Sequence, residues 1–396
     1  MNLPTRSPLR WLPVVLIVMA TMLNYLDRAL LSAAAPAIQA EFHLNNQQYG
    51  EIGSAFAIVY ALVAPLAGLF LDAVGLTLGA SLAVGFWSLA AAATAATRSL
   101  PALVTARIVL GISEAAGIPS TGKTFATYLP PKEMAMGTAS NSIGVSTGAI
   151  LAPLLLSAIT PIWGWRAAFV VGGALGILWL AAWWGAVRAV PADSTDPKPP
   201  APVRDILKDR RLWGISLTNA FIMMLYTLWF YWTTNYFVQQ RHLSPQDANR
   251  MFAWIPPVFG GLGGFAGGWL MLRWIQRGIE PVQSRIRLAG IASVLLLGTA
   301  AVPLMPTAPL AAAAISLSFF FTMALSVAVY ALPLDLFGPA RAGFSIAALT
   351  CSLGLMQVIL LPLIGLMVDR GGFNAVCVGL AFTPLIGYGI LRISLV

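Results

Sequence analysis

The sequence predicts an all-α membrane protein whose twelve transmembrane helices form two pseudo-symmetric six-helix bundles. Of the 396 residues, 58% are hydrophobic and only 9% are charged, whereas soluble proteins carry about 25% charged residues. A chain of this length cannot bury so much apolar surface in water, so the lipid bilayer must solvate most of it. A polar stretch near the middle of the chain separates the apolar runs into two sets.

Each element is predicted from an apolar run that is long enough to cross the membrane, which takes about 20 helical residues. Polar residues or Pro/Gly breaks separate the runs. The first six lie near 11–36, 48–71, 78–97, 102–126, 135–157 and 165–187. The second six lie near 212–237, 249–272, 287–305, 309–332, 342–367 and 373–393.

The polar stretch at 188–211 reads RAVPADSTDPKPPAPVRDILKDRR. Its proline and charge content is typical of a linker. We therefore predict an N-terminal six-helix bundle over 1–187, a cytoplasmic linker over 188–211 and a C-terminal six-helix bundle over 212–396. A repeat of about half the chain is typical of a duplicated transporter fold with a site between the halves.

The N-terminus has features of a secretory signal, because Arg6 and Arg10 precede the apolar run 11–23 and alanines follow at 33–35. A cleavable signal would not carry the polar segment Asn24–Arg28 before its cleavage site. We expect an uncleaved first transmembrane helix.

Orientation follows from the distribution of Lys and Arg in short loops. With both termini in the cytoplasm, sixteen of the 23 basic residues lie on the cytoplasmic side and five on the outer side, with Arg28 and Arg107 inside the membrane. This bias predicts a multi-pass protein of a bacterial-type inner (plasma) membrane. It also accounts for the net charge of +9 without a nucleic-acid partner.

Four ionisable residues fall near mid-membrane in the predicted helices: Asp27, Arg28, Arg107 and Glu114. Such groups cost about 2.5–3.5 kcal/mol each on insertion scales and usually mark a transport path or a proton relay. Asp27 and Arg28 are adjacent and point about 100° apart, whereas Arg107 and Glu114 share a helix face about 10.5 Å apart along the axis. We therefore expect ion pairs between the helices at 11–36 and 102–126 rather than within them.

The motifs Asn24–Arg28 and Arg107–Ala115 resemble the major facilitator superfamily, as do Trp232–Tyr236 and Gly365–Gly372. More narrowly, the chain resembles the anion:cation symporter branch, which moves organic acids such as hexuronates, galactonate and phthalate-type acids. The resemblance implies proton coupling by Asp27 and Glu114, and gating and substrate-charge roles for Arg28 and Arg107.

The chain departs from the family pattern in two loops. Asp72 is kept after the second helix, but residues 73–78 supply no base, and Leu272 replaces the equivalent acid after the eighth helix. In the family these loops are thought to latch the cytoplasmic side. The latch is therefore expected to be weaker here or built differently.

The charges of the four buried residues predict a mechanism. They sum to zero with both acids ionised, and an anionic substrate adds a charge that is costly in a low dielectric. One proton on Asp27 or Glu114 restores neutrality, so substrate and proton favour each other's binding. Arginine suits anion binding because its fork holds a carboxylate bidentately, and we favour Arg107 as the cavity anion site.

We thus expect import of a small organic anion, a sugar acid or other carboxylate, by proton symport with alternating access. Protons are the coupling ion, with no cofactor and no metal. The partners are the substrate and the lipid bilayer, and the chain is expected to act as a monomer. Proton stoichiometry stays open, and so does a static interhelical network as the role of the four charges.

Polar and aromatic residues elsewhere can complete the pocket or simply make interhelical hydrogen bonds. The substrate-binding candidates beside the two arginines are Tyr25, Tyr60, Asn141, Tyr226, Trp229, Asn235, Thr350 and Ser352. Trp232 and Tyr236 near a helix end are instead expected in the interfacial aromatic belt. The GxxxG spacing of Gly144 and Gly148 predicts close helix packing.

Three alternatives have less support. An exchanger of organic anions or organic phosphates would have less need of two acids. A drug/proton antiporter usually has Gly-Pro after a GxxxG, but Ala149 follows Gly148 here. An enzyme is not expected, because the serines and histidines have no triad-like context.

Overall fold

The computed structural model describes residues 8–130, 133–190 and 204–395. These residues form helices and contain no strand. The regular elements are η1 (Pro8–Arg10), α1 (Trp11–Phe42), α2 (Asn46–Val74), α3 (Leu76–Thr94), α4 (Leu100–Glu114), α5 (Gly117–Tyr128), α6 (Met134–Trp163), α7 (Arg166–Ala189), α8 (Arg204–Leu207), α9 (Arg210–Gln239), α10 (Pro245–Asp247), η3 (Ala248–Ala253), α11 (Ile255–Gln276), α12 (Pro281–Leu295), η4 (Leu296–Leu304), α13 (Ala308–Phe337), α14 (Pro339–Ala381) and α15 (Thr383–Leu395).

Within these described residues, eleven helical segments are long and apolar enough to cross a membrane. The last of them, Gly343–Leu395, has 53 residues, more than twice what one crossing needs. It breaks at Gly372, whose φ of 67° and ψ of −175° are not helical. The break lies between the predicted helices 342–367 and 373–393. The all-α membrane fold with twelve apolar segments is thereby confirmed.

Several helices extend beyond their apolar runs. α1 continues through Pro36 to Phe42, and α6 continues to Trp163. Other spans are irregular. A π-helix, η3, precedes α11, and α12 passes into the 3-10 helix η4, which contains Pro303.

Residues 191–203 of the predicted linker lie outside the described residues. The linker's last part includes the short helix α8 and Asp209, whose side chain accepts a hydrogen bond from the backbone N–H of Arg211 and caps the start of α9. The hydrogen bonds from Arg211 hold the pKa of the Asp209 carboxyl below its usual range.

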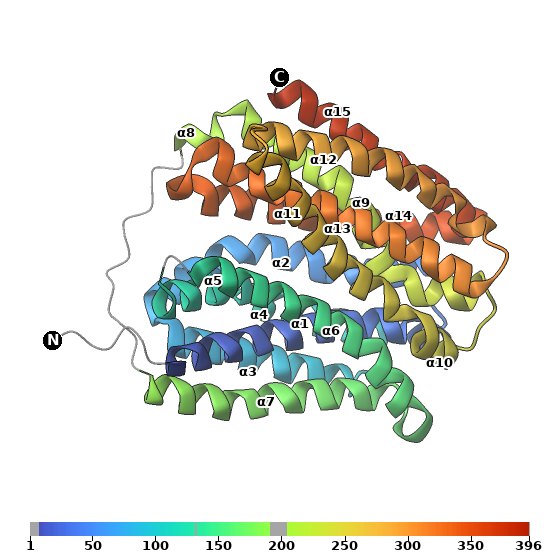
Figure 1. Cartoon of the computed structure of the whole chain (residues 1–396). Helices are drawn as coiled ribbons and strands as arrows, with labels where there is room; N and C mark the ends of the chain where they lie inside the picture. Colours follow the sequence, from blue (N-terminus) through green and yellow to red (C-terminus); the bar gives the residue numbers. More distant parts are fainter. Residues whose placement is uncertain (1–7, 131–132, 191–203, 396) are drawn as a thin grey trace. The chain divides into compact units, whose positions relative to one another are not determined.

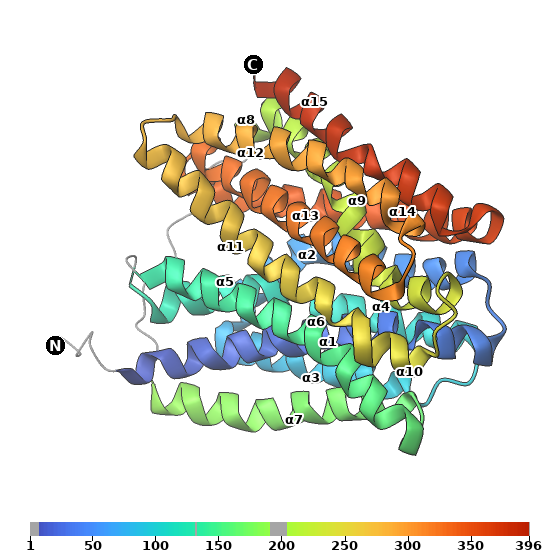
Figure 2. The ribbon, with the colours of Figure 1, turned by 45° about the vertical axis from the view of Figure 1, so that its right-hand side comes forward.

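The described residues divide into two compact units: 8–30 with 62–190 form unit 1, and 31–61 with 204–395 form unit 2. Within unit 1, α3 packs against α4 and α7 (Figures 1 and 2). Within unit 2, α9 packs against α13, α14 and α15, and α11 packs against α13. The division of the chain at 187 and 212 stays a prediction.

A polar network in unit 2 joins the ends of four helices, and we call it the Asn46 network. Asn46 and Gln47 are the first two residues of α2. The Asp369 carboxylate of α14 accepts hydrogen bonds from their backbone N–H groups, at 3.1 and 3.0 Å. It also accepts one from the Asn46 side chain at 2.8 Å. Gln39 of α1 and Gln239 of α9 donate to the Asn46 amide oxygen at 2.9 and 2.8 Å.

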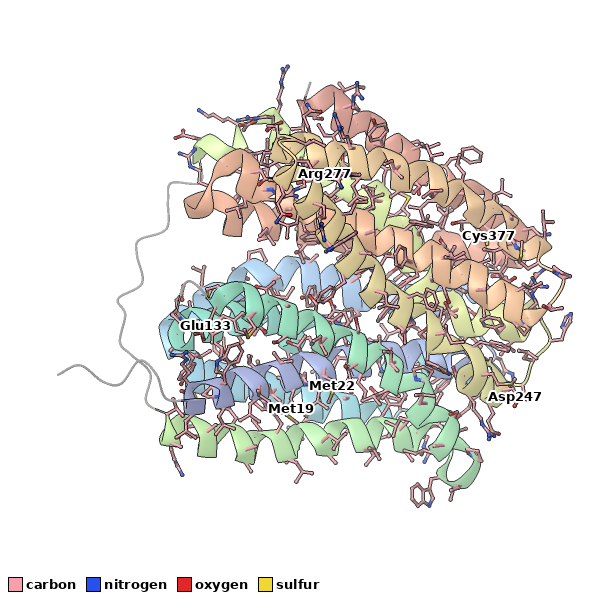
Figure 3. The ribbon with its side chains drawn as sticks, in the orientation of Figure 1. Met19, Met22, Glu133, Asp247, Arg277 and Cys377 are labelled. Carbon is pink, nitrogen blue, oxygen red and sulfur yellow. The ribbon has the colours of Figure 1, made fainter. Side chains whose placement is uncertain are left out.

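Glycines let the helices of each unit approach closely. A Cβ on Gly148 of α6 would collide with the carbonyl oxygen of Met22 and lie 2.9 Å from the nitrogen of Leu26, both in α1; Met22 is labelled on that helix in Figure 3. Gly144 makes the same kind of approach to Val18. The close packing that the GxxxG spacing predicts is present.

This contact makes Gly148→Ala a testable change. The new methyl group meets backbone atoms, which cannot rotate away, and overpacking of this kind costs about 1–3 kcal/mol. We expect a lower melting temperature for the variant purified in detergent. Gly185→Ala in α7 is the matched control, because nothing lies within 4 Å of its Cβ and alanine is the better helix former. Equal melting temperatures for the two variants would contradict the packing.

Candidate functional site

The buried charges of unit 1 form one cluster, which begins with an ion pair between α1 and α4. The Arg28 Nε donates to Glu114 Oε2 at 2.7 Å. The Glu114 side chain is fully buried, whereas the Arg28 side chain is 14% exposed. The predicted pairing across these two helices is therefore present, and it leaves one edge of the arginine accessible.

The local sequence explains why Glu114 ends α4. Pro119 in the next turn has no N–H to donate to the carbonyl of Ala115, and its ring crowds that carbonyl. The chain accordingly interrupts at Ala115 and Ala116, and α5 starts at Gly117. Glu114 thus lies at a helix junction beside the buried amide of Asn24.

Asp27 and Arg107 are buried more deeply than Arg28, each with 1% of its surface exposed. Arg107 Nη2 donates to the Thr94 hydroxyl of α3 at 3.4 Å, and its guanidinium carbon lies 5.2 Å from the centre of the Phe169 ring of α7. Asp27 faces α7 as well, because a Cβ on Gly172 would lie 2.6 Å from its Oδ1. Among the described residues, Asp27 Oδ1 has no hydrogen-bond donor.

Electrostatic interactions connect the Arg28–Glu114 ion pair with Asp27 and Arg107. Arg107 attracts both Asp27 and Glu114, while the two carboxylates repel each other when both are ionised. Two acids and two arginines therefore share one low-dielectric site in which the protonation of one acid alters the charge felt by the other three groups. Such a site can bind an anion together with a proton at no net change in buried charge.

The two arginines differ in access. Arg28 is the one with exposed surface, and its guanidinium carbon lies 5.4 Å from the centre of the Tyr25 ring on the same helix. Arg107 is enclosed by α3, α4 and α7. The assignment of the anion site to Arg107 stays a prediction, and the greater exposure favours Arg28 for first contact with a ligand.

A second polar group lies two helical turns before Arg28 on α1. The Thr21 hydroxyl donates to the Asn141 amide oxygen of α6 at 2.8 Å and lies 3.4 Å from the Thr121 hydroxyl of α5. Thr21, Tyr25 and Arg28 occupy one face of α1 because they are spaced by four and three residues. Asn141 was a predicted candidate, whereas the two threonines carry no distinguishing sequence signal.

The remaining candidates lie in unit 2, where their side chains mostly bond to neighbouring helices. Trp229 Nε1 donates to the Ser318 hydroxyl at 3.0 Å, and Asn235 donates to Gln39 at 2.9 Å. The Ser352 hydroxyl accepts from Asn219 at 3.4 Å, and the Thr350 hydroxyl donates to the carbonyl of Ile346 in its own helix.

The two tyrosine candidates of unit 2 stack on other rings. Tyr60 lies on Phe56, with ring centres 5.7 Å apart, and Tyr226 lies between Phe230 and Phe319 at 5.3 and 5.6 Å. Tyr226 is partly exposed and Tyr60 is buried. Their role in substrate binding stays a prediction.

The placement of Trp232 and Tyr236 in an interfacial belt is wrong. Both are fully buried. Tyr236 donates to the carbonyl of Val302 at 3.1 Å, and Trp232 packs edge-on against Tyr49. The reason is that α13 and α14 pack against α9 and cover this part of it.

In the loop after the second helix, the basic partner of Asp72 comes from outside the loop. Lys123 of α5 donates to the Asp72 carboxylate at 2.7 Å and to the carbonyl of Leu71 at 2.9 Å. The base thus comes from another helix of unit 1 rather than from the loop itself. Because Asp72 is largely exposed, a pair of this kind contributes at most about 1 kcal/mol.

Comparisons with known proteins agree with this architecture. The model of the Major Facilitator Superfamily matches residues 17–359. The hexuronate transporter of Escherichia coli K12 is 28% identical over 403 residues, covering 96% of this chain and 92% of the relative. The galacturonate transporter of Dickeya chrysanthemi is 29% identical over 311 residues, covering 73% of this chain and 90% of the relative.

A crystal structure of a bacterial homologue of the human lysosomal transporter Spinster has a TM-score of 0.79 and 21% identity, covering 98% of this chain and 96% of that one. It shares the fold. With a family model that spans most of the chain, this protein belongs to the Major Facilitator Superfamily and is a membrane transporter rather than an enzyme.

Proposed function

We propose that this transporter carries a small sugar acid into the cell together with protons, by alternating access. Relatives that align over most of the chain are named as transporters of hexuronate and galacturonate, and both compounds are carboxylates that bear several hydroxyl groups. A site for such a substrate needs a cation for the carboxylate and hydrogen-bonding groups for the hydroxyls.

The observation that carries the proposal is the Arg28–Glu114 pair at 2.7 Å. A substrate carboxylate would compete with Glu114 for the same guanidinium. When Glu114 takes up a proton it loses its charge and most of its attraction for Arg28. Arg28 is then available to the substrate, so proton binding and substrate binding support each other.

Asp27 supplies a second proton-accepting group. Arg107 acts on it, and its carboxyl faces Gly172 of α7. A monocarboxylate that enters with one proton leaves transport electrically neutral, and a second proton, held by Asp27, makes it electrogenic. The two acids therefore allow either stoichiometry, with protons as the only coupling species.

The polar face of Thr21 and Asn141 suits the hydroxyl groups of the substrate, because it presents oxygen and nitrogen atoms beside the charged cluster. The excess of basic residues in one set of loops favours an inner-membrane protein with both termini in the cytoplasm. We further propose that one chain is the working unit, since the charged cluster is built from α1, α3, α4 and α7 of a single chain.

The test is uptake of radiolabelled glucuronate, galacturonate and galactonate by proteoliposomes with an imposed inward proton gradient. We expect accumulation above the external concentration for at least one of these acids, and loss of that accumulation when a protonophore is added. A thermal-shift screen against the same acids, phosphorylated sugars and aromatic acids identifies the preferred ligand first.

Two outcomes would contradict the proposal. Uptake that depends on internal counter-substrate and ignores the proton gradient indicates an exchanger. Export of a cationic drug driven by the same gradient indicates an antiporter.

A further inference from the structure

The Asp27 carboxyl lies in an enclosed space that α7 leaves open for it. A Cβ built on Gly172 would lie 2.6 Å from Asp27 Oδ1, which is shorter than any real contact of that kind. The two other atoms nearest that Cβ belong to Leu26 and Leu30, at 3.5 and 3.7 Å. The space between Gly172 and Oδ1 is thus bordered by two leucine side chains, and it exists because residue 172 has no side chain.

The same face of α7 contacts both Asp27 and Arg107. Phe169 lies three residues before Gly172, so the two positions are neighbours on the helix surface. The Phe169 ring lies against the Arg107 guanidinium at 5.2 Å, and Gly172 lies against Asp27. One helix face thus sets where the acid and the arginine can be relative to each other.

Charged groups reach Asp27 from few directions. α4 contributes Arg107 and Glu114, which both act on it, and Arg28 is its neighbour on α1. α3, α6 (Met134–Trp163) and the α7 face around Gly172 contribute no charged side chain. Displacement of the carboxyl away from α7 therefore changes its distances to Arg107 and Glu114, the charged groups of α4 that act on it.

We propose that Gly172 is a positioning residue for proton coupling, whose missing side chain lets the Asp27 carboxyl lie against α7. This role rests on the proposed proton symport. A methyl group at 172 would overlap Asp27 Oδ1 and displace the carboxyl, which changes its distances to Arg107 and Glu114, the two charged groups that act on it. Because these two groups favour opposite protonation states of Asp27, the displacement alters how readily Asp27 takes up a proton.

Gly172→Ala is therefore expected to move the pH at which uptake is half-maximal by about one pH unit. The matched control is Gly176→Ala, one turn further along α7. Its new Cβ also meets a side chain closely, the hydroxyl of Ser88, but no acid lies there.

A melting experiment tests the contact separately from transport. Gly172→Ala is expected to lower the melting temperature in the wild-type background and to have no such effect in the Asp27→Ala background, where the colliding carboxyl is gone. The double variant also remains informative if Gly172→Ala alone fails to fold, because removal of the carboxyl should rescue it.

The outcomes are distinct. A shift of the pH of half-maximal uptake in Gly172→Ala that is absent in Gly176→Ala, together with rescue by Asp27→Ala, supports the role. The same pH profile in Gly172→Ala and the wild type, or equal shifts in both glycine variants, overturns it. Wild-type uptake that ignores the proton gradient overturns the proposed function and this role together, and the melting cycle then still reports whether Gly172 and Asp27 are in contact.

Discussion

Glu114→Gln is expected to abolish proton-driven accumulation of substrate while exchange of internal for external substrate continues. Glutamine has nearly the shape of glutamic acid and can still accept the hydrogen bond from Arg28, but it never ionises. The variant therefore resembles the protonated transporter at every pH. It can bind and exchange the anion, but it no longer couples the reorientation of the empty transporter to proton release.

The sign of the pH dependence follows from the same argument. In the wild type, substrate binds more tightly as pH falls, since protonation of Glu114 weakens its hold on Arg28 at 2.7 Å. In Glu114→Gln the affinity should change less with pH than in the wild type, because only Asp27 can still take up a proton. A charged hydrogen bond is worth about 1.5–3 kcal/mol, so full protonation of Glu114 should change the wild-type affinity by about tenfold or more.

Glu133→Gln is the matched control. Glu133 pairs with Arg10 at 2.7 Å in the same unit, so the substitution and the length of the ion pair are the same. Figure 3 labels Glu133, which directly precedes α6 and is not one of the four buried charges. Normal accumulation by Glu133→Gln and none by Glu114→Gln assigns coupling to the buried pair. A Glu114→Gln transporter that accumulates substrate normally would exclude Glu114 from coupling.

The fold was predictable because hydropathy acts locally. Each crossing needs about 20 apolar residues. Proline, glycine and charged residues in the sequence indicate the breaks around residues 200 and 372. The pairing of Arg28 with Glu114 was also predictable in kind. Helix geometry excludes a pair within either helix, since Asp27 and Arg28 diverge and Arg107 lies two turns from Glu114.

The choice among partners depends on contacts between residues far apart in the sequence, which periodicity does not record. Nothing around Gly172 indicates that its missing side chain makes room for Asp27. The base for Asp72 was sought in the adjacent loop, but it is Lys123, 51 residues away. The burial of Trp232 and Tyr236 depends on how many helices surround α9, and a single helix pattern does not show this.

The Asn46 network of unit 2 provides the second large effect. Asp369 accepts three hydrogen bonds from Asn46 and Gln47, so that the carboxylate of α14 caps α2, a helix more than 300 residues earlier in the chain. Carboxylates at a helix N-terminus are stabilising because they compensate unpaired N–H groups and the helix dipole. The start of α2 also packs against α14 at this point, because Gly365 lies against the backbone of Asn46. We therefore expect the cap to stabilise the packing of α2 on α14.

Asp369→Ala is therefore expected to loosen α2 from α14. Hydrogen bonds to charged groups are worth about 1.5–3 kcal/mol each, and because Asp369 is exposed we expect water to replace most of the three. A net loss of about 1.5 kcal/mol makes the separated arrangement about tenfold more populated. If transport works by alternating access, this variant spends more time with these helix ends apart.

A buried cysteine measures that separation. Ala57 is 1% exposed, and its carbonyl oxygen faces Gly354 of α14. In an Ala57→Cys protein whose own cysteines are replaced by serine, a water-soluble maleimide should react about tenfold faster once Asp369→Ala is added, because labelling follows the population of the open arrangement. Asp247→Ala is the control, since this acid of unit 2, labelled in Figure 3, bonds only to Ser244 of its own turn in the hydrogen bonds described. Equal labelling rates in all three proteins would show that Asp369 does not hold α2 against α14.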